Sequence, residues 1–220
     1  AMAKIPIAIY GAGGFAREVA WLIEVINQTD EQYQLVGFVD DDPKLRGQSI
    51  NDVVVFALED LKSQYPDSRI VSGIGNPQTR QTLMEKSAQA GFTFETLIHP
   101  RAERSRWVEY GEGIVICAGN ILTTNIKLGD HVQINLDCTI GHDVVMGDYT
   151  TLAPGVHVSG WVHFGKRVYV GTGAVIINGT REKPLIIGDD AVIGAGACVT
   201  KSVEPGLTVV GVPARPLQRN

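Results

Sequence analysis

Several features that would point to common protein classes are missing from this sequence of 220 residues. It has no run of basic residues and carries a net charge of −5, so we do not expect a nucleic-acid partner. No apolar run approaches the roughly 18 residues that a membrane-spanning helix needs. The start of the sequence does not combine the basic, apolar and small-residue segments of a signal peptide. These absences predict a cytoplasmic protein without a membrane span.

Cysteine is also scarce. The three cysteines, Cys117, Cys138 and Cys198, form no CxxC pair. Disulfides are rare in cytoplasmic proteins, where free thiols behave as small apolar side chains. We therefore expect three reduced and buried thiols. The apolar content of 44% is ordinary for a globular protein, and the length suits one or two domains.

What the chain does contain is a six-residue repeat that runs from Tyr110 to Val203. The first position of every hexad is apolar, and the second is usually small or polar. The first positions are Tyr110, Ile116, Leu122, Leu128, Ile134, Ile140, Met146, Leu152, Val158, Phe164, Val170 and Ile176, followed after an interruption by Ile187 and Ile193. Such a repeat predicts a parallel β-helix, in which each hexad is a short strand plus a corner and its first residue points inward. A β-sandwich is the alternative, but it requires alternation and tolerates variable spacing between turns.

The repeat also predicts which residues lie above one another. If three hexads close one coil, positions eighteen apart in the sequence stack. Thr124, His142, Gly160 and Asn178 then form one column along the edge of a cleft. The regular spacing is interrupted by five extra residues, which we place at 182–186.

The first 100 residues follow a different pattern, in which apolar segments alternate with helical ones. We expect strands at 4–10, 35–39, 53–56, 69–72 and 92–98, and helices at 17–27, 58–65 and 78–90. This alternation predicts a parallel α/β sheet. The chain is therefore expected to comprise a small Rossmann-like domain over residues 1–100 and a β-helix domain over residues 101–220.

A glycine-rich turn follows the first expected strand and opens the first helix. Gly11 permits a tight turn, Gly13 lets a phosphate approach the backbone, and Ala16 is the small third position of the GxGxxG/A pattern. The start of the helix offers unpaired N–H groups to an anion. The second strand ends in Asp40 and Asp41, where an acidic residue commonly holds a ribose hydroxyl. The alternative is a tight turn between strand and helix that binds no ligand.

The size of this domain limits the class of nucleotide that it could bind. A dinucleotide-binding domain has two mononucleotide halves and about six strands. Residues 1–100 have room for little more than one half. We therefore expect a mononucleotide or a nucleotide-sugar rather than NAD.

The repeat contains four of the five histidines, namely His131, His142, His157 and His163. None is at an inward first position, so all four are expected to face outward. His142 differs from the others because Asp143 follows it and Gly160 is predicted to lie one coil above it. Asp143 can accept a hydrogen bond from the imidazole, and glycine leaves space beside the ring and exposes an N–H. A base next to an oxyanion donor is what acyl transfer to an amine or hydroxyl requires.

Zinc binding is the alternative use of these four histidines. The γ-class carbonic anhydrases, which also have left-handed β-helices, hold zinc between subunits with three histidines. Those enzymes have neither an N-terminal nucleotide-binding domain nor a tail such as the GVPAR segment of this chain. We therefore expect no metal.

Several segments together resemble the sugar acyltransferases of the sialic-acid O-acetyltransferase and bacillosamine-pathway (NeuD/PglD) type. These segments are GAGGFAREV, VDDD, IGNPQTR, IHP, GHD and a terminal GVPAR, and they span nearly the whole chain. The resemblance implies that the β-helix is left-handed and that three copies form a homotrimer with active sites between subunits. It also implies that acetyl-CoA lies between adjacent β-helices, that the N-terminal domain binds a nucleotide-linked sugar, and that the protein acts in polysaccharide biosynthesis.

The resemblance assigns roles to individual residues. His142 matches the catalytic base, Asp143 stands at the position of its partner, and Gly160 matches the oxyanion donor. The positions that match the nucleotide-sugar site are Gly11, Gly13, Gly14, Phe15, Asp40, Asp41, Gly75 and Asn76. Those assigned to the coenzyme are Gly160, Thr172, Gly173, Asn178, Gly211, Pro213 and Arg215. Many members have histidine where this chain has Phe15.

The expected reaction is transfer of an acetyl group from acetyl-CoA to the amine of a UDP-, dTDP- or GDP-linked 4-amino-deoxysugar. We expect direct attack without an acyl-enzyme, because no serine or cysteine pairs with His142. Two alternatives stay open, O-acetylation of a sugar of the sialic-acid type and a non-catalytic nucleotide-sugar scaffold. The loop over residues 178–186 either affects the choice of acceptor or acyl donor or is a surface loop without a role in the site.

Overall fold

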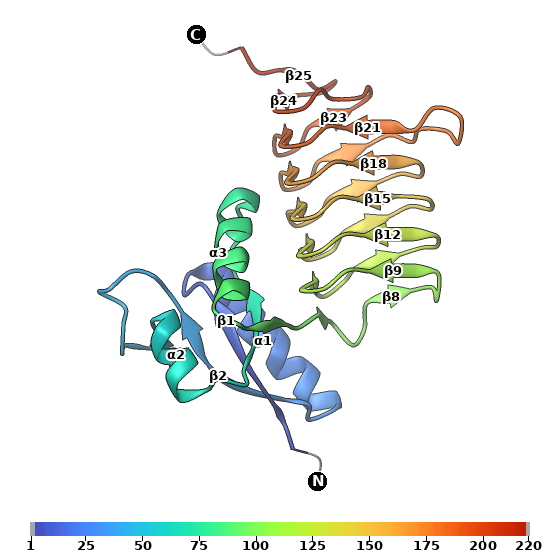
Figure 1. Cartoon of the computed structure of the whole chain (residues 1–220). Coiled ribbons are helices and arrows are strands. Elements are labelled where there is room, and N and C mark those ends of the chain that lie inside the picture. Colours follow the sequence, from blue (N-terminus) through green and yellow to red (C-terminus); the bar gives the residue numbers. More distant parts are fainter. Residues whose placement is uncertain (1–2, 219–220) are drawn as a thin grey trace. The chain divides into compact units, whose positions relative to one another are not determined.

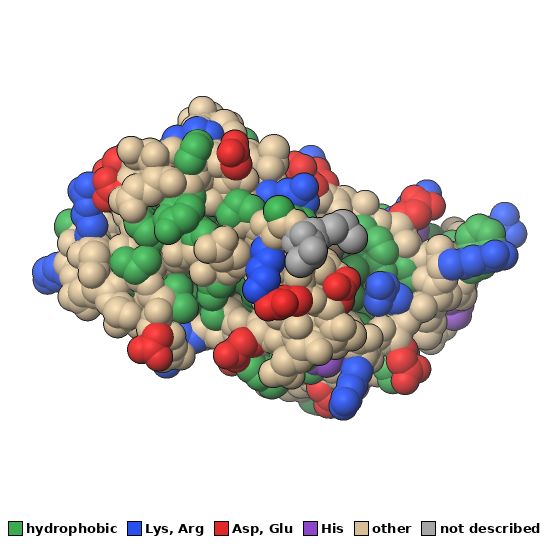
Figure 2. Space-filling view, turned by 90° about the horizontal axis from the view of Figure 1, so that it is seen from below, with side chains coloured by type: hydrophobic (Ala, Val, Ile, Leu, Met, Phe, Trp, Pro, Cys, Tyr) green, Lys and Arg blue, Asp and Glu red, His purple; other side chains and the backbone are tan. Residues whose placement is uncertain are grey.

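The computed structural model (Figure 1) describes residues 3–218 and contains two compact units. The first unit includes the chain up to Pro100 together with Glu112–Val115, and the second includes Arg101–Gly111 and the chain from Ile116 onward. No helix among the described residues is long and apolar enough to cross a membrane. On the face in Figure 2, acidic and basic side chains are interspersed rather than gathered into a basic patch.

The first unit is a parallel sheet with three helices. Its strands are β1 (Ile5–Tyr10), β2 (Tyr33–Val39), β3 (Ser49–Ile50), β4 (Val53–Phe56), β5 (Arg69–Ser72) and β6 (Thr93–Phe94), and its helices are α1 (Gly14–Thr29), α2 (Leu58–Gln64) and α3 (Pro77–Gln89). The sheet order is β3-β4-β2-β1-β5-β6, and only β3 runs antiparallel to its neighbour. β2 and β4 lie on one side of β1, whereas β5 and β6 lie on its other side, so the strand order reverses at β1. Ligands of α/β sheets bind at such a switch point, beyond the carboxyl ends of the strands.

Close contact between α1 and the loop after β5 explains the small residues of the glycine-rich turn. Ala16 is fully buried in the first turn of α1. A Cβ atom at Gly73 would lie only 2.6 Å from the Cα atom of Ala16. Both positions must therefore be small for the helix to approach the sheet. Gly11 has a φ of +111°, a conformation that glycine adopts without a steric penalty.

The strand predicted at 92–98 is two strands in the structure. Its first half is β6, which pairs with β5 at the edge of the sheet. Its second half is β7 (Leu97–Ile98), where the N–H of Leu97 donates to the carbonyl of Ile114. The prediction was wrong because the two halves pair with different parts of the chain, and the sequence of residues 92–98 does not reveal where the pairing changes.

The second unit is the predicted left-handed parallel β-helix, with three sheets. In one sheet, which also includes β7, the strands are β10 (Val115–Ile116), β13 (Gln133–Ile134), β16 (Thr151–Leu152), β19 (Tyr169–Val170), β22 (Val192–Ile193), β24 (Thr208–Val210) and β25 (Arg215–Pro216), the last antiparallel. In the second they are β8 (Glu103–Arg104), β11 (Ile121–Leu122), β14 (Thr139–Ile140), β17 (His157–Val158), β20 (Val175–Ile176) and β23 (Cys198–Val199). In the third they are β9 (Val108–Tyr110), β12 (Ile126–Leu128), β15 (Val145–Met146), β18 (Val162–Phe164) and β21 (Leu185–Ile187).

The stacking interval of eighteen residues is confirmed by the strand register. Leu122 pairs with Ile140, Ile140 with Val158, and Val158 with Ile176. From Ile116 to Ile193, the apolar first positions of the hexads are at most 5% exposed. The interior is therefore a continuous apolar column, and the corners carry the polar residues.

The five extra residues lie earlier than predicted. Val162 pairs with Leu185 rather than with Thr180, as an interval of eighteen would require. Gly179 still follows the regular ladder, because its N–H donates to the carbonyl of Gly160. The insertion is therefore Thr180–Pro184, in the orange loop beside β21 in Figure 1. The prediction of 182–186 was wrong because the hexad phase alone cannot distinguish an apolar strand residue such as Leu185 from a loop residue.

The cysteines follow the prediction at two of three positions. Cys117 and Cys138 are buried, but Cys198 is partly exposed. Cys198 adjoins the buried Val199 in β23, so strand alternation turns its side chain outward. Burial raises the pKa of the Cys138 thiol to about 11.

Candidate active site

His142 lies at the corner between β14 and β15, with its side chain 56% exposed. Its Nδ1 atom is 2.8 Å from Oδ2 of Asp143. Asp143 has a φ of +58°, a left-handed conformation that aspartate tolerates better than most residues, and its N–H donates to the carbonyl of Thr124. When the carboxylate accepts a hydrogen bond from Nδ1–H of the neutral imidazole, Nε2 is left with a lone pair that can act as a base.

Gly160 lies directly against the imidazole of His142, one coil further along. A Cβ atom at Gly160 would be 2.6 Å from both Cε1 and Nε2 of the ring. The imidazole thus occupies the volume that any other side chain at position 160 would need. Among the described residues, no acceptor takes a hydrogen bond from the N–H of Gly160. A free backbone donor therefore lies next to a free ring nitrogen, which is the arrangement that acyl transfer uses.

The other histidines of the repeat are placed differently from one another. His131 is only 4% exposed and stacks on Tyr149, with ring centroids 5.2 Å apart. The prediction that it faces outward was wrong, because its ring lies against Tyr149 of the next coil. His157 is exposed and contacts Thr139, whereas His163 is partly buried. Within residues 3–218, no three His, Cys, Asp or Glu side chains form a group that could hold a metal ion.

The glycine-rich turn forms the start of α1. Gly13 is the N-cap residue, and no side chain caps the helix there. A Cβ atom at Gly13 would meet no other atom within 4 Å, so the space beside this backbone is open. Gly14 is the first helical residue, and Phe15 is partly buried behind it. The first N–H groups of α1 are therefore accessible to an anion such as a phosphate.

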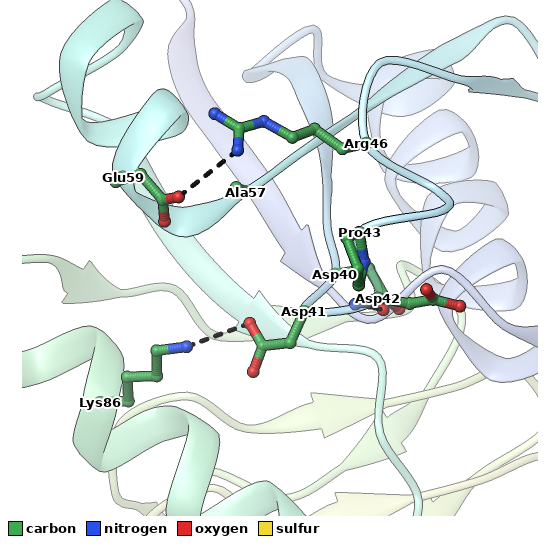
Figure 3. Close-up of a pocket in the computed structure, with 8 residues that line it drawn as sticks. All are labelled: Asp40, Asp41, Asp42, Pro43, Arg46, Ala57, Glu59 and Lys86. Carbon is green, nitrogen blue, oxygen red and sulfur yellow. Dashed lines mark hydrogen bonds and ion pairs between the residues drawn. The ribbon is translucent and has the colours of Figure 1, made fainter.

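A pocket of about 320 Å³ lies beyond the carboxyl end of β2 (Figure 3). It is lined by Asp40, Asp41, Asp42, Pro43, Arg46, Ala57, Glu59 and Lys86. Oδ1 of Asp41 accepts hydrogen bonds from the Tyr10 hydroxyl at 2.6 Å and from Nζ of Lys86 at 3.1 Å. Oδ2 of Asp41 accepts no hydrogen bond from the described residues and is left to accept one from a ligand. Oδ1 of Asp40 accepts the N–H of Asp42 and shapes the turn.

Tyr10 and Lys86 position Asp41, and no sequence motif predicted a role for either residue. Tyr10 is 1% exposed, and burial, followed by its hydrogen bond to Asp41, raises its pKa well above the ordinary value. The neutral hydroxyl therefore remains a donor. Lys86 is on α3, 45 residues from Asp41. No local motif connects them, so only the folded sheet shows that they meet.

The two residues predicted in the loop before α3 have separate environments. Asn76 caps the helix, because its Oδ1 accepts the N–H of Thr79 at 2.9 Å. Gly75 has open space beside it, and its carbonyl accepts a hydrogen bond from the fully buried Arg80. Arg80, for which no sequence motif predicted a role, holds this loop by donating hydrogen bonds to the carbonyls of Ile74 and Gly75. Both residues are therefore engaged within the fold, Gly75 through its carbonyl and Asn76 through its side chain, while the space beside Gly75 is open.

The residues assigned to the coenzyme are not all brought together. Thr172 and Gly173 are exposed at the corner after β19, and the amide of Asn178 donates to the carbonyl of Gly179. Arg215 lines a separate pocket of about 280 Å³ near the last coils. Its other lining residues are Val199, Thr200, Lys201, Ser202, Val203, Leu207, Val209, Ala214 and Pro216. Gly211, with φ at +92°, and Pro213 form the turn that leads into β25.

Comparison with known proteins relates this arrangement to characterised enzymes. Residues 6–87 match the family model of the PglD N-terminal domain. Over 218 residues the chain is 37% identical to GDP-perosamine N-acetyltransferase of Escherichia coli O157:H7, a match that covers 96% of each protein. The structure of WeeI from Acinetobacter baumannii AYE shares 39% identity, with a TM-score of 0.90 over 97% of this chain and 100% of that one.

A further solved relative was crystallised together with its ligands. It is perosamine N-acetyltransferase from Caulobacter crescentus, crystallised with CoA and GDP-perosamine after one histidine was changed to asparagine. It shares 29% identity, with a TM-score of 0.87 over 100% of this chain and 99% of that one. These similarities extend over both units and are not limited to the β-helix. The chain therefore belongs to the family of sugar N-acetyltransferases that join a PglD N-terminal domain to a hexapeptide-repeat β-helix, and it is an acyltransferase.

Proposed function

We propose that this protein transfers the acetyl group of acetyl-CoA to the amine of a GDP-linked 4-amino-deoxysugar of the perosamine type. The observation that carries the proposal is the contact among His142, Asp143 and Gly160, which combines a free ring nitrogen with a free backbone N–H. The choice of GDP and of perosamine is supported by the 37% identical relative, whose similarity extends over 96% of the chain.

In the proposed mechanism, Nε2 of His142 takes a proton from the sugar amine as its nitrogen attacks the thioester carbonyl. Asp143 holds the imidazole and stabilises its positive charge, while the N–H of Gly160 donates to the developing oxyanion. The C–N bond forms, the C–S bond breaks, and the departing CoA thiolate takes the proton from His142. No acyl-enzyme is needed, and the buried Cys138 thiol is unsuited to form one because its pKa is about 11.

We further propose that the domain over residues 1–100 binds the nucleotide. The open backbone at Gly13 and the first turn of α1 suit its phosphates, and Oδ2 of Asp41 can accept a hydrogen bond from its ribose or base. In the β-helix domain over residues 101–220, the pocket that contains Lys201 and Arg215 offers two cationic side chains for the phosphates of CoA.

The assembly and setting are proposed from the family that the sequence resembles. Three copies would form a homotrimer in which CoA lies between adjacent β-helices, and the enzyme would act in the cytoplasm in polysaccharide biosynthesis. The loop Thr180–Pro184 carries exposed Arg181 and Lys183, which makes it a candidate contact for the acceptor or for the acyl donor.

The proposal is tested by supplying acetyl-CoA with GDP-, UDP- and dTDP-linked 4-aminosugars and with sialic acid. We expect thiol release to be fastest with GDP-perosamine, together with a product that is heavier by one acetyl group and stable to mild base, as an amide is. A base-labile product from sialic acid would instead establish O-acetylation. Nucleotide binding in a thermal-shift assay without thiol release from any acceptor would establish the scaffold alternative.

A further inference from the structure

The imidazole of His142 is not held in place by burial, because its side chain is 56% exposed. The hydrogen bond from Nδ1 to Asp143 fixes one end of the ring. A single exposed pair of this kind contributes little free energy, and the ring can leave it by rotation. Some other contact is therefore needed to hold the ring in the one orientation that directs Nε2 toward the substrate.

Trp161 supplies a second contact with the ring. The centroids of the indole and the imidazole are 6.5 Å apart, and their planes meet at 84°. This edge-to-face arrangement is within the range in which aromatic pairs attract one another. Trp161 directly follows Gly160, so the residue with the free N–H and the residue that contacts the ring are consecutive.

The backbone of Trp161 is tied to the coils on both sides. Its N–H donates to the carbonyl of His142 at 3.0 Å, and its carbonyl accepts the N–H of Leu185 at 2.9 Å. Leu185 is the first residue after the insertion, so the regular hydrogen bonding between coils resumes at Trp161. The indole thus extends from a fixed point that is linked directly to His142.

The conformation of Trp161 is unusual for a large residue. Its φ is +57°, and the residues eighteen and thirty-six positions earlier in the same column, Asp143 and Asn125, are of the types that adopt this conformation most easily. Where other corners hold a large left-handed residue, it has a side-chain partner. Tyr149 stacks on His131, and Arg167 pairs with Asp190.

For Trp161 the corresponding partners are two imidazoles. One is that of His142, and the other is that of His163, whose ring centroid is also 6.5 Å away at a tilt of 47°. A large side chain on a strained backbone conformation indicates that this side chain has a role.

We infer that Trp161 is a positioning residue that holds the imidazole of His142 in its reactive orientation. This inference rests on the proposed function of His142 as the base. Asp143 fixes Nδ1, the absence of a side chain at Gly160 leaves room for the ring, and the indole prevents the ring from turning away. Trp161 contacts neither substrate in this role and acts only through His142.

The kinetic test compares Trp161→Asn with Trp161→Phe. Asparagine suits the left-handed backbone, so Trp161→Asn is expected to fold with a thermal midpoint no lower than that of the parent protein. We expect its kcat to fall about tenfold, with KM for both substrates within about twofold, because a misdirected base slows chemistry without weakening binding. Trp161→Phe keeps an aromatic contact and should retain at least half of the parent kcat. The control is Trp107→Asn, which makes the same change at an exposed tryptophan. The ring of Trp107 contacts the guanidinium group of Arg106, not a histidine, so this substitution should leave kcat unchanged.

A double substitution isolates the route of the effect. In a His142→Ala background, Trp161→Asn should cause no further loss, because there is no imidazole left to position. An equal loss in both backgrounds, or a raised KM with unchanged kcat, would overturn the inference and make Trp161 a substrate contact. Parent-like kcat in Trp161→Asn would overturn it as well.

A spectroscopic test separates this inference from the proposed reaction, since it needs no substrate. The ring protons of His142 in the parent protein should carry a ring-current shift from the indole, measurable by NMR after assignment with His142→Ala. That shift should disappear in Trp161→Asn and persist in Trp107→Asn. Unchanged His142 resonances in Trp161→Asn would refute the contact, whereas failure of the reaction assay with an intact ring-current effect would refute only the proposed function.

Discussion

Residues that act together in the β-helix are eighteen positions apart and are aligned by backbone hydrogen bonds, whereas the pocket of the α/β unit gathers side chains from several elements. His142 and Gly160 meet because their strands are neighbours in a ladder. Asp41, Tyr10 and Lys86 meet because β1, β2 and α3 pack together and their side chains form hydrogen bonds. The backbone hydrogen bonds of the β-helix determine which residues lie beside His142. The arrangement of the pocket depends instead on individual side-chain contacts. Substitutions in the first unit should therefore alter KM, and those at the corner of the second should alter kcat.

The largest expected effect is that of His142→Ala. Removal of the base should lower kcat by about 10²-fold or more. The affinity for GDP-perosamine, measured by calorimetry, should not change. The matched control is His157→Ala, at an exposed histidine of β17 whose side chain contacts Thr139 of the neighbouring strand β14, and its kcat should stay within about twofold of the parent. Full activity in His142→Ala would show that this residue is not the base. It would also contradict the proposal that the corner of the β-helix determines kcat.

Gly160→Ala tests the ladder itself. The new Cβ atom would lie 2.6 Å from two atoms of the His142 ring, so the ring must move. We expect kcat to fall about 10- to 100-fold, because a displacement of about 1 Å at a reacting group can cost that much. Ser159→Ala, at the exposed neighbouring residue, is the control and should be nearly neutral. A Gly160→Ala enzyme with normal kcat would show that the close approach of these two residues has no role in catalysis.

Asp41→Asn is expected to have the smallest effect and to act on binding alone. Loss of the carboxylate charge should raise KM for the nucleotide-sugar and Kd for GDP about tenfold, as expected for a hydrogen bond to a charged acceptor, and kcat should not change. The control is Asp52→Asn, at an exposed turn residue with φ at +63° that asparagine also accommodates. A lower kcat with unchanged Kd would contradict the assignment of this pocket to nucleotide recognition.

The site of the β-helix unit could be predicted from the sequence more fully than the pocket of the α/β unit, for a physical reason. A fixed period converts sequence distance into spatial distance, so the stacking of His142 on Gly160 and the hydrogen bond between His142 and Asp143 were both predictable. The period does not specify how a corner turns. His131 was expected on the surface but is buried, because its ring stacks on the aromatic ring of Tyr149 in the next coil.

The α/β unit shows the opposite balance. Its helices, its glycine-rich turn and most of its strands were predicted, since propensity and alternation are local properties, but β3 was not predicted and the strand expected at 92–98 is two strands. Its pocket was predicted only in part, because Asp40 and Asp41 follow a strand, whereas Tyr10, Lys86 and Arg80 gain their roles from contacts across the sheet. Nothing in the segments that contain these three residues distinguishes them from other buried or surface positions.

By itself the sequence determined the two architectures, the interval of eighteen residues and the histidine that lies beside a glycine. These follow from periodicity and from the backbone freedom of glycine, which act over short distances. The tertiary structure alone decided that Trp161 faces His142, that the inserted residues are Thr180–Pro184, and that two donors converge on one oxygen of Asp41. Those outcomes depend on packing between coils and between elements, where the direction of a side chain is fixed by neighbours that are remote in the sequence.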